Sequence, residues 1–178
     1  RSPRPAKLQC QLMTDRTPST RFHALIPCAG TGTRAGTVQP KQYQQVAGQP
    51  MVMHTVQALA QVPQLASGWV ILSADDDHGW AEQGWPERFR RVACGGASRA
   101  ESVFNGLKAM LAAGLDPQDW VLVHDAARCL VAPAEIRALI AACLSDPVGG
   151  LLALPLPDTL KAARADEAGA RVAATLTR

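Results

Sequence analysis

Short apolar segments of strand length recur along this chain, and they constrain its fold more than any other feature. Four of them are apolar on consecutive residues instead of alternate ones, which is typical of strands buried on both faces of a parallel sheet. A fifth segment, RFRRVAC, alternates apolar and polar residues. The expected strands are residues 22–29, 68–74, 88–94, 119–127 and 149–156.

Segments with apolar residues at helical spacing separate these strands. The second of them opens with Ser98 and Glu101, which form the pattern of a capping box. The expected helices are residues 51–62, 98–113 and 132–144. Alternation of strands and helices predicts an α/β fold, a Rossmann-like three-layer sandwich with a mainly parallel sheet.

Three loops rich in small or charged residues follow these strands. Their sequences are AGTGTRAG, GGASR and HDAAR. Because the carboxyl ends of parallel strands meet at one edge of a sheet, we expect the three loops to converge there. The sequence therefore predicts a binding site at that edge.

The charge and composition suggest how the chain is organised. Residues 1–21 carry five Arg or Lys against one Asp, and this polar stretch is expected to be a disordered basic leader or a tag. Residues 22–154 are the expected core of the chain, and residues 155–178 an expected β-hairpin that protrudes from it.

Composition also argues against several classes of function. The net charge of +3 is concentrated in the leader, and the body carries no basic stripe for nucleic acid. No apolar run is long enough to span a bilayer, so a cytoplasmic protein without a membrane partner is expected. The five cysteines contain no C-x-x-C pair, which argues against a zinc site or a disulfide framework.

The stretch ALIPCAGTGTRAGTVQPKQY, residues 24–43, has the composition of a phosphate-binding loop. No Walker A string is present, and although Gly30, Gly32 and Ala35 match the dinucleotide pattern, no helix is expected directly after them. What remains is a glycine loop whose backbone N–H groups wrap a polyphosphate, reinforced by Arg34 and Lys41. The alternative is a tight turn with two solvated cations.

The segments PCAGTGTRAG, PKQY, GGASRAESV, LVHDAAR and LPDTLK occur in this order, and together they resemble the 2-C-methyl-D-erythritol 4-phosphate cytidylyltransferase family over residues 22–178. The resemblance implies transfer of CMP from CTP to 2-C-methyl-D-erythritol 4-phosphate, with release of pyrophosphate, in isoprenoid precursor biosynthesis. It also implies Mg²⁺ as cofactor. Residues 22–154 would be the nucleotidyltransferase core, and residues 155–178 an arm through which a homodimer forms.

The resemblance implies roles for individual residues. Arg34 and Lys41 would be catalytic and stabilise the transition state. The nucleotide-binding residues would be Pro27, Cys28, Ala29, Gly30, Gly32, Gly96, Ser102 and Ala126. Asp125 would bind both the metal and methylerythritol phosphate, together with Arg128, Thr159 and Arg178. Ser102 could equally be an ordinary helix residue, and Arg178 a frayed terminal one.

The chain also departs from the family pattern. Cys28 replaces a usual alanine, Thr33 an arginine and Cys129 a proline. The family continues past Arg178, so the arm is expected to be truncated there. Two other functions stay open: a ribitol 5-phosphate cytidylyltransferase, and a non-catalytic CTP-binding fragment.

Overall fold

The computed structural model describes residues 20–30, 40–76, 85–155, 157–166 and 169–176. The chain forms two compact units, Arg1–Ile136 and Arg137–Arg178, and each is described by itself. The boundary expected after residue 154 remains a prediction. No helix within the described ranges is long and apolar enough to cross a membrane.

Four strands form a parallel sheet in the first unit, in the order β5-β4-β1-β6. Strand β1 (Phe22–Pro27) lies between β4 (Leu65–Leu72) and β6 (Trp120–Val123), and β5 (Phe89–Ala93) pairs with β4 at the edge. The predicted α/β fold with a mainly parallel sheet is confirmed. The interior position of β1 explains its apolar sequence, because its side chains are buried on both faces.

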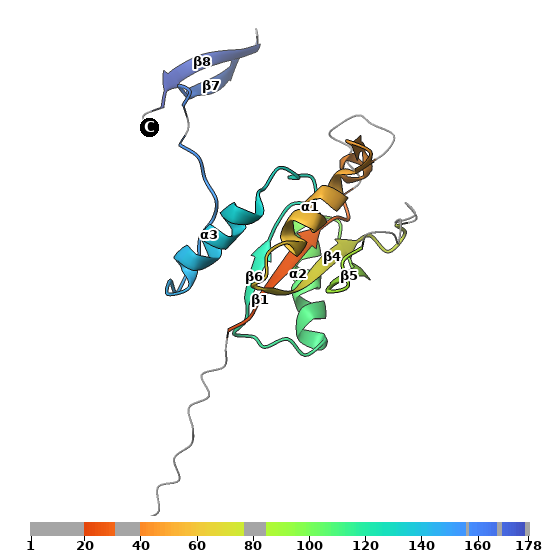
Figure 1. The fold of residues 1–178 in the computed structure, drawn as a ribbon. Coiled ribbons are helices and arrows are strands. Elements are labelled where there is room, and N and C mark those ends of the chain that lie inside the picture. Colours follow the sequence, from red (N-terminus) through yellow and green to blue (C-terminus); the bar gives the residue numbers. More distant parts are fainter. Residues whose placement is uncertain (1–19, 31–39, 77–84, 156, 167–168, 177–178) are drawn as a thin grey trace, which may run out of the picture. The chain divides into compact units, whose positions relative to one another are not determined.

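Two helices cover opposite faces of this sheet (Figure 1). On one face, α2 (Arg99–Ala112) packs Met110 against Leu25 and Ile71. Gly106 lies in the middle of α2, where a Cβ atom would come within 2.9 Å of both of those side chains. This glycine therefore allows the helix to lie close against the sheet.

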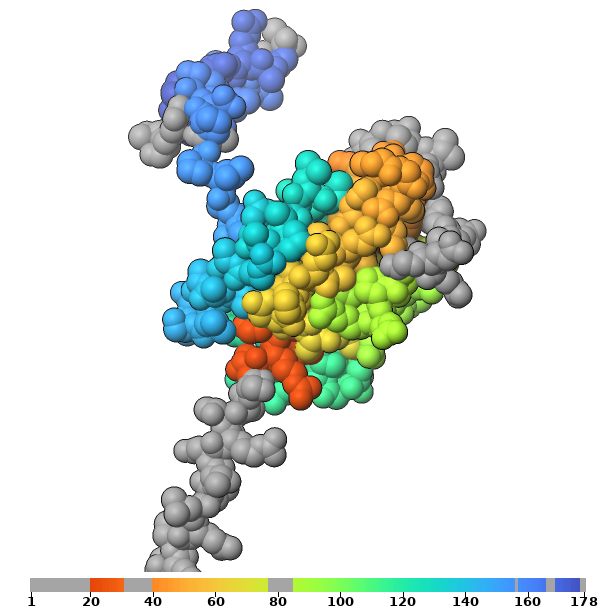
Figure 2. Space-filling view, viewed as in Figure 1, coloured from red at the N-terminus to blue at the C-terminus, as the bar shows by residue number. Residues whose placement is uncertain are grey.

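The other face is covered by α1 (Met51–Ala60), whose residues Val52 and Val56 are fully buried. In the space-filling view, the rest of the chain hides most of β1, and only its beginning (red) is visible (Figure 2). A third helix, α3 (Pro133–Cys143), spans the boundary between the two units.

The segment before α1, expected to be loop, contains short elements. A single-turn 3-10 helix, η2 (Lys41–Tyr43), is followed by the strands β2 (Gln45–Val46) and β3 (Gln49–Pro50). Ala47 and Gly48 connect these strands with φ angles of 47° and 85°, and a glycine adopts the second of them without strain. As expected, no helix longer than one turn occurs in residues 40–50.

The sequence predicts a strand at residues 149–156. The prediction is wrong for residues 149–155, which the structure describes and which form no strand. This segment pairs with no other strand, and Leu154 is 92% exposed. An apolar run becomes a strand only where a neighbour supplies its backbone hydrogen bonds. The expected hairpin does form, from β7 (Lys161–Asp166) and β8 (Gly169–Thr175).

A largely buried polar network joins β1 and β4 to the residue before β6, at the end of the sheet where β1 begins. The ring of His23 lies with Nδ1 2.8 Å from Ser67 Oγ and Nε2 3.2 Å from Asp119 Oδ2. The backbone N–H of Arg21 donates to Asp119 Oδ1 at 2.9 Å. Because an ionised carboxylate only accepts, Nε2 of His23 carries a proton.

These contacts shift the titration of Asp119. Burial alone raises the pKa of its carboxyl, but the hydrogen bonds from Arg21 and His23 outweigh burial and lower the pKa below its ordinary value. A lowered folded-state pKa means that the stabilisation is present above the unfolded pKa of about 3.9. It is lost as the pH falls through the folded value.

We expect Asp119→Asn to lower the free energy of unfolding at pH 7 by about 1–3 kcal/mol, because it removes a charged acceptor from a buried network. The difference from wild type should shrink as the pH falls below about 4. Urea unfolding followed by tryptophan fluorescence measures both quantities. Glu87→Gln, the same change of charge at an exposed position, serves as control. A constant difference across this pH range would contradict the assignment.

Candidate functional site

A cavity of about 780 Å³ opens at the carboxyl ends of the strands. The loop after each of the four strands contributes to its wall, and Gln42 of η2 completes the lining. The lining residues are Pro27–Gly30, Gln42, Ser73–Asp75, Gly95–Arg99, Ser102 and Asp125–Ala127. The described parts of the three loops singled out in the sequence, which for the first loop are Ala29 and Gly30, thus converge at one edge of the sheet.

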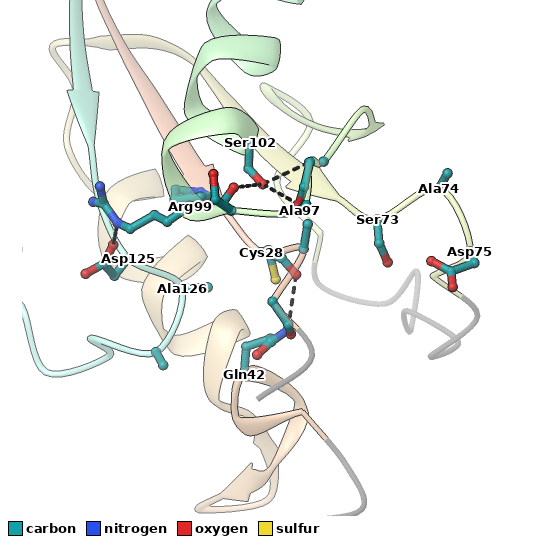
Figure 3. A pocket seen from close by; sticks show the side chains of 17 residues that line it. Cys28, Gln42, Ser73, Ala74, Asp75, Ala97, Arg99, Ser102, Asp125 and Ala126 are labelled. Atoms are coloured by element: carbon teal, nitrogen blue, oxygen red, sulfur yellow. Dashed lines mark hydrogen bonds and ion pairs between the residues drawn. The ribbon is translucent and has the colours of Figure 1, made fainter. Parts of the chain in front are cut away.

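The beginning of the glycine loop is fixed by backbone and side-chain hydrogen bonds. The N–H of Cys28 donates to Ile71 O at 2.8 Å, which extends the pairing of β1 with β4 by one residue. The side-chain amide of Gln42 donates to Cys28 O at 3.1 Å and to Gly30 O at 2.7 Å (Figure 3). Sequence reasoning missed Gln42, although it lies between two residues of the quoted PKQY segment.

The thiol of Cys28 is buried beside the cavity. Burial raises its pKa to about 12, so the thiol stays protonated at neutral pH. It donates to Tyr43 Oη at 3.8 Å, and the Tyr43 hydroxyl donates to Asp76 Oδ2. The pair of residues Tyr43 and Asp76 therefore links η2 to the loop after β4.

The glycine pair of the GGASR loop, Gly95 and Gly96, lies against the beginning of the glycine loop. The N–H of Gly95 donates to Leu72 O at 2.7 Å, and a Cβ atom at Gly95 would overlap the Cβ of Ala29. Gly96 N–H donates to Ser102 Oγ at 3.0 Å, and the Ser102 hydroxyl donates to Ser98 O at 2.9 Å. Ser102 is 3% exposed, and its hydroxyl holds the backbone of this loop.

Ser98 caps the start of α2 as predicted, but Glu101 bonds the residue before the cap and does not close the capping box on Ser98. Ser98 Oγ accepts from the N–H of Glu101 at 3.1 Å, and Glu101 Oε2 accepts from the N–H of Ala97 at 2.9 Å. The first turn of α2 is thereby fixed beside the cavity. The next residue after the cap, Arg99, points its side chain toward Asp125 (Figure 3).

Asp125 lies two residues beyond β6, and its carboxylate forms ion pairs with two arginines. Nε of Arg99 donates to its Oδ1 at 2.7 Å, and Nε of Arg128 donates to its Oδ2 at 2.9 Å. Burial raises the pKa of Asp125, but the hydrogen bonds and charges of both guanidinium groups lower it below its usual range. Sequence reasoning found Asp125 and Arg128 but missed Arg99, for which the GGASR loop was the available signal.

A side chain of α1 also holds the loop that contains Asp125. Thr55 of α1 is fully buried, and its Oγ1 donates to Ala126 O at 2.8 Å. This bond connects residues 71 positions apart in the chain. It fixes the peptide next to Asp125, and the sequence offered no signal for it.

The lining residues offer few ligands for a metal. No group of three or more His, Cys, Asp or Glu side chains gathers among the residues that the structure describes. Asp125 does present a carboxylate to the cavity, and a hard divalent cation often needs only one or two carboxylates besides substrate phosphates. The residues present therefore fit a divalent cation that is bound jointly with a triphosphate.

The remaining predicted site residues do not line the cavity or cannot be placed. Lys41 is exposed on η2, and Arg128 is 76% exposed beyond the lining. Thr159 is exposed in the second unit. Gly32, Arg34 and Arg178 lie outside the described residues.

Comparison with protein families identifies this arrangement. The model of the IspD family, 2-C-methyl-D-erythritol 4-phosphate cytidylyltransferase, matches residues 22–178. The chain belongs to the IspD family. The family is that of a nucleotidyltransferase, so the resemblance drawn from the sequence motifs is confirmed.

Individual IspD relatives agree with this assignment. The bifunctional enzyme IspD/IspF of Albidiferax ferrireducens is 56% identical over 165 residues, covering 93% of this chain and 38% of that protein. The 2-C-methyl-D-erythritol 4-phosphate cytidylyltransferase of Dechloromonas aromatica is 48% identical over 158 residues, covering 87% and 67%. The chain thus spans about two fifths of the length of the first relative and about two thirds of the length of the second.

The fold is similar to that of a solved IspD structure. A crystal structure of 4-diphosphocytidyl-2C-methyl-D-erythritol synthase superposes with a TM-score of 0.73 at 29% sequence identity. The match covers 89% of this chain and 69% of that one. The Rossmann-like character expected from the order of strands and helices is confirmed.

Replacement of one of the two arginines should change the pKa of the Asp125 carboxyl. We expect Arg99→Gln to raise the pKa of the Asp125 carboxyl toward its ordinary value, because one of the two guanidinium groups that lower it is gone. An NMR titration of the side-chain carboxyl measures the change. Lys108→Gln removes a positive charge from the same helix without touching Asp125 and should leave this pKa unchanged. Equal pKa values in all three proteins would contradict the described contact.

Proposed function

We propose that this IspD chain transfers CMP from CTP to 2-C-methyl-D-erythritol 4-phosphate and releases pyrophosphate, in isoprenoid precursor biosynthesis. One observation carries the proposal. In a chain of this family, the glycine loop, the GGASR loop and Asp125 line one cavity at the carboxyl ends of a parallel sheet. We expect this reaction to take place in the cytoplasm.

The chemistry asks little of an enzyme nucleophile. A phosphate monoester has a second pKa of about 6, so the acceptor phosphate is already mostly a dianion at neutral pH. One of its oxygens forms a bond to the α-phosphorus of CTP. The bond from that phosphorus to the oxygen bridging to the β-phosphate breaks, and pyrophosphate leaves with the electron pair. The neutral Cys28 thiol agrees with a reaction that needs no cysteine nucleophile.

The difficulty is to bring two anions together, and the residues assigned here address it. Pro27, Cys28, Ala29, Gly30 and Gly32 would cradle the triphosphate through backbone N–H groups, while Arg34 and Lys41 would stabilise negative charge in the transition state. Gly96, Ser102 and Ala126 would adjoin the nucleoside. The hydrogen bonds of Ser102 support an indirect role, through the backbone of the GGASR loop.

The acceptor phosphate would be held by charged and polar side chains. We assign Asp125 and Arg128 to the methylerythritol phosphate, together with Thr159 and Arg178, and we add Arg99 because it shares the carboxylate of Asp125. Asp125 would also hold Mg²⁺. When bound, this ion supplies positive charge that neutralises phosphate oxygens.

Pyrophosphate release from CTP with magnesium tests the proposed reaction. We expect release with 2-C-methyl-D-erythritol 4-phosphate and none with ribitol 5-phosphate, the acceptor of the competing cytidylyltransferase function. Lys41→Met should lower the rate about 10²- to 10³-fold, as the loss of a single electrostatic contact to the transition state does elsewhere. Lys108→Met, at an exposed lysine on α2, is the matched control.

The other outcomes of this assay separate the alternatives. Release with ribitol 5-phosphate alone would assign the chain to that substrate instead. CTP binding without release from either acceptor would identify a binding-competent piece that lacks part of the catalytic apparatus.

We also propose that the chain forms a homodimer through the arm, residues 155–178. An isolated two-stranded hairpin is marginally stable in water, and β7 and β8 leave Val172 69% exposed. Packing of this hairpin on a second copy would bury that surface.

Light scattering after size exclusion tests the dimer. We expect a mass about twice that of one chain, and a monomer for Val172→Asp, because a charge buried in an apolar contact is costly. Leu144→Asp, at a leucine that is 63% exposed outside the arm, should leave the dimer intact. A monomeric wild-type chain, or dissociation by both variants, would contradict the role of the arm.

A further inference from the structure

The side-chain amide of Gln42 makes an unusual pair of contacts for a pocket residue. Its nitrogen lies 3.1 Å from Cys28 O and 2.7 Å from Gly30 O. Only 8% of Gln42 is exposed. Both contacts therefore form in a largely desolvated environment, where the loss of either one leaves a polar group poorly satisfied.

The orientation of this amide is determined by its partners. Both neighbouring atoms are carbonyl oxygens, which only accept hydrogen bonds, so the nitrogen and not the oxygen of the amide must face them. An amide nitrogen has two hydrogens, and two carbonyls are present. Gln42 thus has the number and the direction of donors that the beginning of the glycine loop requires.

The contacts fix the direction of the peptide planes in the loop. In a trans peptide, the C=O of one residue and the N–H of the next point to opposite sides. Because Cys28 O points to Gln42, the N–H of Ala29 points away from Gln42. A rotation of that peptide plane would reverse both groups, aim a carbonyl oxygen where the N–H had been and repel a phosphate.

The loop needs an external restraint because its own sequence provides little. Among the residues that the structure describes, and apart from its chain neighbours, no atom lies within 4 Å of where a Cβ of Gly30 would be, and glycine adopts many backbone conformations at little cost. On the strand side, the loop is tied by the hydrogen bond from Cys28 N–H to Ile71 O at 2.8 Å. The two bonds from Gln42 restrain the loop beyond that point.

Gln42 is itself held firmly. Its neighbour Tyr43 is 4% exposed and donates a hydrogen bond to Asp76 in the loop after β4. The N–H of Tyr43 donates to Pro40 O at 3.0 Å, and the N–H of Met51, the first residue of α1, donates to Gln44 O at 2.9 Å. The first of these bonds closes the turn of η2 around Gln42, and the bonds of Tyr43 and Gln44 tie η2 to the loop after β4 and to α1.

We propose that Gln42 is a positioning residue that holds residues 28–30, where the glycine loop begins, in the conformation whose backbone N–H groups bind the triphosphate of the nucleotide. The inference rests on the proposed function for the identity of the ligand, but the restraint on the loop exists without ligand. Gln42 acts through the backbone of Cys28 and Gly30 and takes no part in bond making or breaking.

Two variants remove the contacts in different ways. Gln42→Glu is nearly isosteric but has no donor when ionised and a single one when protonated, so it cannot satisfy both carbonyl oxygens. Gln42→Met fills a similar volume without any donor and introduces no charge. Gln45→Glu, three residues further on at an exposed position of β2, is the control for the change of charge.

The first readout needs no ligand. Amide hydrogen exchange of the Cys28 N–H is measured by NMR in the full chain, with the Leu25 and Ile26 amides of the same strand as internal reference. We expect Cys28 to exchange about tenfold faster or more in both Gln42 variants, with the reference amides unchanged. The Gln45→Glu variant should match wild type.

The second readout separates positioning from general instability. In the pyrophosphate assay, we expect KM for CTP to rise about tenfold to a hundredfold in both Gln42 variants, since each lost hydrogen bond is worth up to about tenfold. The kcat and the KM for the acceptor should stay within about threefold of wild type. A merely structural role would lower the fraction of active protein and leave KM for CTP unchanged.

The combined outcomes decide between the two proposals. Unchanged Cys28 exchange in both variants, or an unchanged KM for CTP in an active enzyme, would overturn the role of Gln42. The wild-type chain could also neither bind CTP nor release pyrophosphate, while the Cys28 N–H still exchanges faster in the Gln42 variants. That result would support the restraint by Gln42 and refute the proposed function.

Discussion

The parallel pairing of β1 with neighbours on both sides is the constraint on which the site depends. It buries the apolar side chains of β1 on both faces and ends with the N–H of Cys28 bonded to Ile71 O. On the other side, the N–H of His124 donates to Leu25 O at 2.9 Å, so the loop that carries Asp125 leaves the sheet beside β1. Because all these strands run in one direction, chain segments that are far apart in sequence must form one cavity.

The cavity is built largely from backbone that buried side chains hold in place. Gln42 binds two carbonyls of the glycine loop, Ser102 binds the GGASR loop, and Thr55 binds the peptide beside Asp125. Each of these side chains is less than 9% exposed. Backbone donors fixed in this way are already oriented before an anion arrives, so little reorganisation is needed when charge develops.

Much of this could be predicted from the sequence, and the failures have physical reasons. The consecutive apolar residues of β1 and β4 indicated buried parallel strands, and Ser98 with Glu101 indicated the start of α2. Residues 149–155 carry the same apolar signal but form no strand, because pairing is a property of neighbours and not of composition. Gln42 and Thr55 were missed since a polar residue gives no local sign of the distant carbonyl that it will bind. Arg99 was missed because its partner, Asp125, lies 26 residues away.

The charged part of the site has a different physical character from its backbone. Arg99 and Arg128 are 60% and 76% exposed, and Asp125 is 33% exposed. Ion pairs this open to water contribute only about 0–1 kcal/mol, so a phosphate can replace Asp125 as the partner of either arginine at little cost. A buried pair would hold its partners too tightly for such an exchange. The proposed reaction binds two anions and releases two others, and this combination suits it: a rigid backbone would set the geometry, and weakly paired charges would accept and release each phosphate in turn.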